Sequence, residues 1–316
     1  MRTRLQSPRP LAPGKARRVT RRTAWSLPWI IRAFYIIVAY RLFEARAGLR
    51  DYFQPETELI PLWPVFWAEW VRADQAAFAV GILLAAAALF AVLIPQFRWV
   101  RIAFAFALLQ YLGLNYSFGK IGHGSHLVLW ISIILIFLPR GYHHPRIEGF
   151  NPVRSTAMLS IIQIAIALSY TLSGCWKIIG ALWQAAHGDI QIFHPRALEL
   201  HLAARVLQTQ ENPPLTHWVI ENSGWLWPLM PLTVLIQLLA LPAAFRPRLH
   251  LLWGLLLLGM HLFISLSMGI HFRDNFWLLL LFFVASPIQY QSGWKDFFRD
   301  LRFFNPSKAL SNRSTR

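Results

Sequence analysis

The chain has 316 residues, of which 56% are hydrophobic and only 14% are charged. This balance excludes an ordinary soluble domain of that length and is typical of a protein with several membrane-spanning segments. The net charge of +17 therefore does not predict a nucleic-acid partner, because each cation must first be assigned to one side of the membrane. A single cysteine excludes an intrachain disulfide framework.

The chain begins with a basic arm over residues 1–24, which carries eight Lys and Arg residues and no acid. This composition predicts a disordered segment on the cytoplasmic side, held against anionic membrane lipids. The apolar run that follows is interrupted by Arg32 and Arg41 and lacks an obvious cleavage site, so it does not read as a signal peptide. A second basic segment, residues 301–316, is predicted on the same side.

Between the arm and the tail, hydropathy predicts an all-α transmembrane domain over residues 25–300, a helical bundle of about eight spans. With the arm inside, most of the 31 Lys and Arg residues fall in cytoplasmic segments and most of the 14 acids fall outside. This division predicts an even number of spans with both termini cytoplasmic, and leaves seven or nine spans as alternatives. The expected spans are Trp25–Phe43, Gln75–Ile94, Trp99–Tyr116, Ile121–Leu138, Ala157–Trp183, Trp225–Phe245, Leu249–Ile270 and Phe272–Ile288.

Two outer segments are long enough to hold amphipathic helices. In residues 61–72, Trp63, Phe66, Trp67 and Trp70 recur at helical spacing, which predicts one aromatic face lying along the membrane interface. An aromatic ligand box is the alternative. In residues 180–224, a helix opened by Pro195 and a short turn over residues 215–222 are expected to cap the outer side of the bundle. The apolar side of that helix comprises Leu198, Leu202 and Val206.

Lys177 is the least expected residue of the fifth span, because an ammonium inside a membrane helix needs a partner, water or a function. The alternative is a snorkelling lysine whose head reaches the membrane interface. The predicted topology places Lys177 and His261 in the outer parts of their spans. Other polar residues are expected at a similar depth, namely Arg41, Glu44, Asn115, Tyr116, Lys120, His123, His126, His271, Arg273 and Asp274.

Each of these residues, taken singly, has an ordinary structural explanation as an interfacial or packed side chain. Because buried ionisable groups seek one another or a water-filled pocket, we nevertheless expect a shared outer cavity. No metal site is predicted, since the spacing of His123 and His126 is unspecific and no carboxylate or cysteine is placed to complete it.

The stretch Tyr170–Ile178, with its Ser-Gly-Cys-Trp-Lys-Ile run, resembles a signature of the HTTM (horizontally transferred transmembrane) family. That family shares a membrane domain with the vitamin K-dependent gamma-glutamyl carboxylases. The likeness covers most of residues 25–300. The order and spacing of the matching stretches support it more than any single motif does. Further matching stretches are His123–His126, Met260–Phe263, Gly269–Phe272 and Ala285–Pro287.

The resemblance implies a multi-pass protein of a bacterial inner membrane with a cavity on the outer face. It implies that Lys177 is the base that deprotonates a reduced quinone, with His126 or His123 and His261 as supporting polar groups. A lysine withdrawn from water can be neutral near pH 7, the form in which it accepts a proton. We further expect Arg41, Asn115, His123, His271 and Arg273 to contact the ligand, a quinone-like or peptidyl molecule.

Three departures limit what the resemblance implies. Gln237 stands where the family tends to place an acid, Trp183 and Gly188 are displaced, and the large lumenal region of the carboxylases is missing. Carboxylation of glutamate is therefore not the expected activity. Compact HTTM proteins also resemble a membrane component that helps to mature a secreted peptide. A non-enzymatic protein that binds or escorts a secreted peptide partner is the alternative function, and a transporter is disfavoured because no paired interrupted spans are visible.

Overall fold

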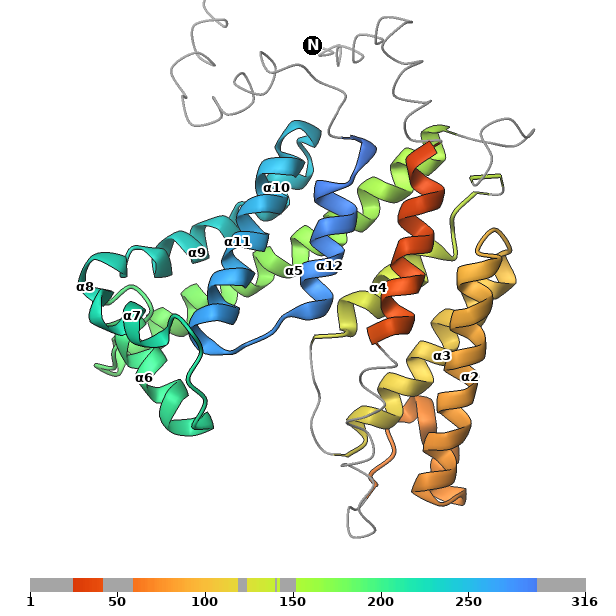
Figure 1. Cartoon of the computed structure of the whole chain (residues 1–316), viewed down its shortest axis with the longest axis horizontal. Coiled ribbons are helices and arrows are strands. Elements are labelled where there is room, and N and C mark those ends of the chain that lie inside the picture. The colour runs from red at the N-terminus through yellow and green to blue at the C-terminus, as the bar shows by residue number, and fades with distance from the viewer. Residues whose placement is uncertain (1–24, 42–58, 119–123, 140, 143–151, 289–316) are drawn as a thin grey trace, which may run out of the picture.

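The computed structural model describes residues 25–41, 59–118, 124–139, 141–142 and 152–288, and every regular element in these residues is helical (Figure 1). The all-α fold class is therefore confirmed. The basic arm, the basic tail, Glu44, Lys120 and His123 lie outside the described residues. After a first helix over residues 25–41, the elements are η1 (Trp63–Trp70), α2 (Ala73–Leu93), α3 (Arg98–Tyr116), α4 (His126–Leu135), α5 (Pro152–Ala186), α6 (Ala197–Thr209), α7 (Thr216–Glu221), α8 (Ser223–Leu226), α9 (Leu229–Leu238), α10 (Ala240–Ala244), η2 (Pro247–Leu249), α11 (His250–Met268), α12 (Arg273–Leu279) and η3 (Leu280–Val284).

Three helical segments are long and apolar enough to cross a membrane, namely Ala73–Leu93, Arg154–Ala186 and Pro247–Met268. They correspond to α2, most of α5, and α11 with the turn before it. The other expected spans coincide with helices that are shorter, less apolar or interrupted. Helix α4, for example, has ten residues, a rise of about 15 Å, which is half of a hydrocarbon layer.

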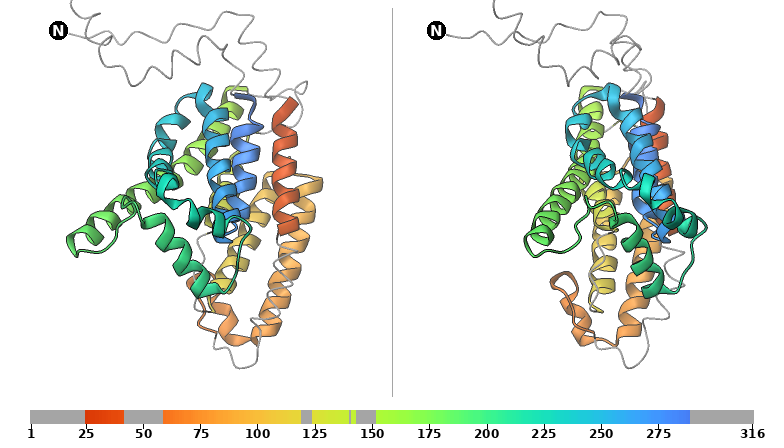
Figure 2. Two further views of the ribbon diagram at one scale, coloured as in Figure 1. Left: turned by 60° about the vertical axis from the view of Figure 1, so that its left-hand side comes forward. Right: turned by 90° about the vertical axis from the view of Figure 1, so that its left-hand side faces the viewer.

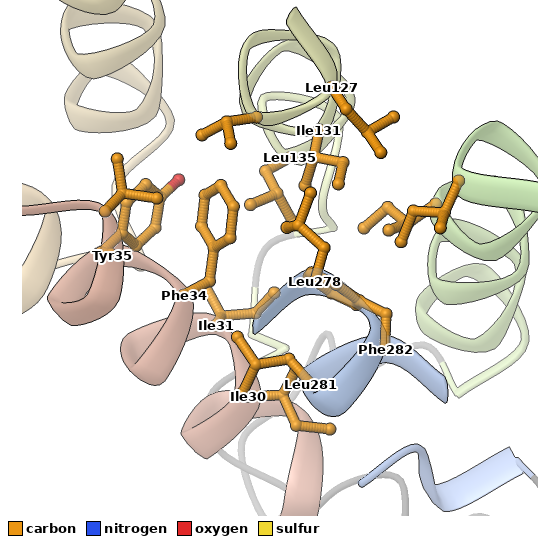
Figure 3. Close-up of a cluster of buried hydrophobic side chains, with 14 of the residues drawn as sticks. Ile30, Ile31, Phe34, Tyr35, Leu127, Ile131, Leu135, Leu278, Leu281 and Phe282 are labelled. Atoms are coloured by element: carbon orange, nitrogen blue, oxygen red, sulfur yellow. The ribbon is translucent and has the colours of Figure 1, made fainter. Parts of the chain in front are cut away.

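The core lies between the first helix, α4 and α12 with η3 (Figure 3). Phe34 of the first helix, Ile131 of α4 and Phe282 of η3 are each at most 1% exposed, and all three belong to one cluster of buried apolar side chains. Helices α2 and α3 form an antiparallel pair beside this core, and α5 runs obliquely across the bundle (Figure 1).

The sixth expected span, residues 225–245, is broken into α8, α9 and α10, and Pro242 explains the break between α9 and α10. Pro242 has no N–H to donate to the carbonyl of Leu238 four residues earlier. Thr171 of α5 fills the gap: its hydroxyl contacts the carbonyls of Gln237 and Leu238 at 3.1 and 3.3 Å and accepts a hydrogen bond from the N–H of Leu241. The break is thus held by a side chain of the neighbouring helix.

The expected last span also changes its geometry, because α12 continues into the π-helical turn η3. The N–H of Ala285 bonds to the carbonyl of Leu280, five residues earlier, at 2.8 Å. Gln163 of α5 donates its amide to the carbonyl of Phe282 at 2.6 Å and to the hydroxyl of Ser286 at 3.0 Å. A polar side chain therefore ties η3 to α5 inside the apolar core.

The expected cap of short helices is present, and its expected apolar side is partly confirmed. Leu198 and Leu202 of α6 are at most 1% exposed, whereas Val206 is only partly buried. Helices α6, α7 and α8 lie together beside the end of α11 (Figure 2). Three donors from the cap bond to the last carbonyls of α11: Arg205 to Met268, the N–H of Leu215 to Leu266, and Thr216 to Ser267.

The expectation for residues 61–72 needs a correction. The segment forms a 3₁₀ helix, η1, with a kink at Val65, and three residues per turn cannot place all four aromatic rings on one side. Trp67 turns inward and donates its indole N–H to Gln110 at 2.8 Å. The rings of Trp63, Phe66 and Trp70 are at least 55% exposed.

Arg101, within the third expected span, lies inside the bundle at 1% exposure. Its guanidinium donates hydrogen bonds to backbone carbonyls of two separate segments. The acceptors are Pro95 at 2.9 Å and Gln96 at 3.3 Å before α3, and Ile136 at 3.4 Å and Leu138 at 3.0 Å after α4. One side chain thereby joins the loop before α3 to the end of α4.

Candidate functional site

Lys177 faces the interior side of α5, where it meets α9. Its amine donates to the side-chain oxygen of Gln237 at 2.6 Å and to the hydroxyl of Ser173, one turn earlier, at 3.1 Å. Both acceptors are neutral, and among the described residues no carboxylate forms an ion pair with Lys177. The lysine is therefore held in place without a counter-ion.

Gly174 explains how α5 and α9 come close enough for that contact. A methyl group at this position would lie 3.0 Å from the backbone nitrogen of Leu238 and 3.2 Å from the Cβ atom of Gln237. Real side chains rarely tolerate such a separation, so a glycine permits the closest approach of the two helices at this point. The Gly-x-x-Lys spacing thus places the amine one turn beyond the narrowest part of the helix pair.

Gln237 is itself fixed by its surroundings. It is 4% exposed, and its amide nitrogen lies 3.6 Å from the sulfur of Met260 on α11. Because the nitrogen faces a weak acceptor, the oxygen is the end of the amide that faces Lys177. The orientation of the amide therefore matches the need of the amine for an acceptor.

His261 lies on α11, opposite Tyr170 of α5. Its Nε2 atom is 2.6 Å from the Tyr170 hydroxyl, and the ring stacks at a tilt against Phe272 with centroids 4.9 Å apart. Its Nδ1 atom is buried and has no hydrogen-bond partner within the described part of the chain. This nitrogen is therefore closed off from the cavity, and Tyr170 engages the other ring nitrogen.

These groups line one cavity with a volume of about 430 Å³, which we call the lysine cavity. The cavity brings together Lys177, His126 and His261, the three residues expected to support base chemistry. Its size falls within the range of small-molecule sites. Most of the remaining wall is apolar, contributed by Leu127, Trp130, Met260, Ile264, Met268, Ile270 and Phe272.

The residues expected to contact the ligand lie in a neighbouring hollow. Arg41, Asn115, His271 and Arg273 line this outer pocket, which has a volume of about 290 Å³. It shares only Phe272 and Asn275 with the lysine cavity. The expected single outer cavity is thus replaced by two adjoining ones, because the segment from Phe272 to Asn275 lies between them.

Several residues of the lysine cavity had not been predicted as site residues. Ser173 and Tyr170 lie four and seven positions before Lys177, a spacing that places them on the same face of a helix, so periodicity could have found them. Gln237 had been noted only as a departure from the family pattern. Asn275 had no signal of its own, since it lines the cavity from the first turn of α12.

Neither a cluster of metal ligands nor a cysteine lies on these pockets in the described part of the chain. Within the described residues, no group of three or more His, Cys, Asp or Glu side chains is placed to hold a metal ion. Cys175 is exposed on the outer side of α5 and does not line the lysine cavity. The chemistry on offer is therefore hydrogen bonding and proton transfer by Lys177, His126, His261 and Tyr170.

Comparison of the chain with family models, with curated proteins and with solved structures finds no match.

Proposed function

We propose that the chain is an HTTM-type membrane protein whose lysine cavity binds a reduced, quinol-like molecule, and that Lys177 removes a proton from a hydroxyl group of this ligand. The observation that carries the proposal is the position of Lys177. Its amine lies on the wall of an apolar cavity, and neutral acceptors alone hold it. A lysine without a counter-ion in such a place loses its proton more readily than one in water, and the neutral amine is a base.

The apolar wall suits a flat ring system, and the polar residues suit its oxygens. A neutral Lys177 would take the proton of a ligand hydroxyl, which leaves an ammonium on the protein and a negative charge on the ligand oxygen. Ser173 and Gln237 would then accept hydrogen bonds from that ammonium. His126 and Asn275, on the wall of the same cavity, would bind a second polar group of the same ligand.

The proposal is tested with a naphthol, a two-ring compound with one weakly acidic hydroxyl whose anion has its own absorption band. Purified protein should produce the anion band at a pH where free naphthol stays neutral. Lys177→Ala and Lys177→Arg should both lose the band, because the guanidinium does not act as a base. The unfolding temperatures of the variants serve as the control for folding.

An intact band with Lys177→Arg would contradict base chemistry. A permanent cation would then be sufficient, and the site would act by stabilising a bound anion. That result would favour the second function, a non-enzymatic component that binds or escorts a secreted peptide. The hydrogen bonds to Ser173 and Gln237 would hold an ammonium equally well, which is the observation that favours this alternative.

We also propose eight spans in an inner membrane, with both termini cytoplasmic and the lysine cavity facing outward. The orientations of the helices support this arrangement: Arg41 at the end of the first helix pairs with Asp274 at the start of α12, so these two helices are antiparallel. Ser125, directly before α4, bonds to the same aspartate. Helix α4 therefore also begins at this end of the bundle.

Single cysteines introduced in a Cys175→Ser background test the sidedness. Gln208→Cys on the cap should react with an impermeant thiol reagent in intact cells, whereas Phe245→Cys, at the other end of the bundle, should react only after the membrane is opened. Both residues are exposed, so access to solvent does not distinguish them. Labelling of Phe245→Cys in intact cells would refute the proposed topology.

A further inference from the structure

The ion pair between Arg41 and Asp274, at the end of the first helix, lies between two adjoining hollows, one of which is the outer pocket. The guanidinium Nε atom of Arg41 lies 3.2 Å from one carboxylate oxygen of Asp274, and the hydroxyl of Ser125 donates to the other at 2.8 Å. Both carboxylate oxygens are therefore engaged. The same three residues, together with Asn115, line both the outer pocket and a second hollow of about 110 Å³.

The second hollow, which we call the shaft, leads into the bundle between the first helix, α3, α4 and α12 with η3. Arg41, Asn115, Ser125 and Asp274 lie where it meets the outer pocket, and Tyr111 and Trp277 also line it. Below them the wall is apolar: Phe34, Ile37, Val38, Leu108, Leu112, Val128, Leu278 and Leu281. A small hollow with a mainly apolar wall accommodates a short apolar chain better than a polar one.

The outer pocket is rich in positive charge and hydrogen-bond donors. Arg41 and Arg273 contribute two guanidinium groups, and among the described lining residues Asp274 is the one carboxylate. His271, whose Nδ1 atom lies 2.6 Å from the hydroxyl of Ser265, adds a further polar ring. Guanidinium groups bind carboxylates and phosphates through charge-assisted hydrogen bonds, so this mouth favours an anion.

We propose that the outer pocket and the shaft together bind a single-chain anionic amphiphile. Its carboxylate or phosphate head contacts Arg273 and Arg41, and the first carbons of its chain enter the shaft past the Arg41–Asp274 pair. Carboxylate and phosphate heads share this chemistry, and the experiment below separates them. The site goes beyond the proposed function, because its lining includes neither Lys177 nor either histidine of the lysine cavity.

The full chain in phosphatidylcholine nanodiscs provides the binding assay, with empty nanodiscs subtracted to remove partition into lipid. The probes are octanoate, octyl phosphate and the neutral ether octylglycerol. Both anions should bind on the order of tenfold or more tightly than octylglycerol, the effect of one charge-assisted hydrogen bond. The tighter of the two anions identifies the head group that the mouth prefers. Equal binding of octylglycerol would overturn the proposal.

Arg273→Gln tests the head, and Arg72→Gln is its matched control, because Arg72 is an exposed arginine outside both hollows. Arg273→Gln should weaken octanoate binding by about tenfold and leave octylglycerol unchanged, whereas Arg72→Gln should change neither. Equal effects of the two variants would show that the anion responds only to net charge, and the proposed mouth would be wrong.

Val38→Phe tests the shaft by filling it from the first helix, with Val71→Phe as a control at an exposed site. Val38→Phe should abolish octanoate binding, and unchanged affinity would overturn the role of the shaft. Acetate and inorganic phosphate give the same test without any substitution. Each methylene that enters the shaft should strengthen binding roughly three- to fourfold, so acetate should bind far more weakly than octanoate. Equal affinities would exclude an apolar subsite.

Discussion

Arg101 on α3 and Lys177 on α5 both point into the helical bundle, and they are held in different ways. Arg101 is 1% exposed and donates hydrogen bonds to backbone carbonyls of two separate segments. These acceptors are part of the main chain, so they cannot rotate away as a side chain can. Lys177 is partly exposed to a cavity and bonds to two side chains, Ser173 and Gln237, that can rotate. The first cation joins parts of the chain, and the second is available to a ligand.

Removal of Arg101 should have the largest effect on stability. Arg101→Leu leaves its carbonyl partners without a donor in a buried place, and each such group costs about 1 to 3 kcal/mol. We expect the free energy of unfolding to fall by roughly 3 kcal/mol or more, measured by denaturant titration in detergent. Arg98→Leu, on the same helix and exposed, is the matched control and should be nearly silent. A similar loss in both variants would contradict the joining role of Arg101.

A methyl group at Gly174 should have an intermediate effect. Gly174→Ala forces α9 away from α5, and overpacking of this kind costs about 1 to 3 kcal/mol. The same shift should lengthen the contact between Lys177 and Gln237. Gly180→Ala on the same helix is the control, because a methyl group there meets nothing within 4 Å. Unfolding temperatures should separate the two variants, and equal temperatures would show that the helices are not in close contact at Gly174.

Loss of the acceptor for Lys177 should have the smallest effect. Gln237→Leu removes one hydrogen bond, but the amine lies on a cavity into which water can enter, so we expect a loss of about 1 kcal/mol or less. Gln208→Leu, at an exposed position on α6, serves as the control for the change of residue type. A loss as large as that of Arg101→Leu would show that Lys177 is a structural cation, and the comparison between the two would fail.

The positions of several helices could be predicted from hydropathy, whereas the places at which a helix breaks or changes its geometry could not. The fifth expected span, Ala157–Trp183, lies within the longer α5, and the second nearly coincides with α2. The π-helical turn of η3 depends on Gln163, a residue on another helix, and a local pattern does not contain that contact. The inward turn of Trp67 likewise depends on Gln110.

Part of the candidate site could be predicted from the sequence, because the predicted topology gives the depth of each residue within its span. Lys177, His126 and His261 line one cavity because α5 and α11 both run toward the end of the bundle at which α4 begins, and each residue lies near that end. The separation of the Arg41 pocket from that cavity was not predictable. This separation depends on the position of residues 272–275 in the fold, and a local sequence pattern does not contain that position.

The length of α5 has a further consequence for a protein of this kind. Its 35 residues rise about 52 Å, well beyond the roughly 30 Å of a hydrocarbon layer, and the helix lies obliquely to α11 and α12 (Figure 1). A helix under such hydrophobic mismatch adjusts its tilt when the bilayer becomes thinner or thicker. Because α5 carries Lys177 and touches α9 at Gly174, a change of tilt moves one wall of the lysine cavity relative to the other. Bilayer thickness would then act as a mechanical input to the site, with no effector molecule required.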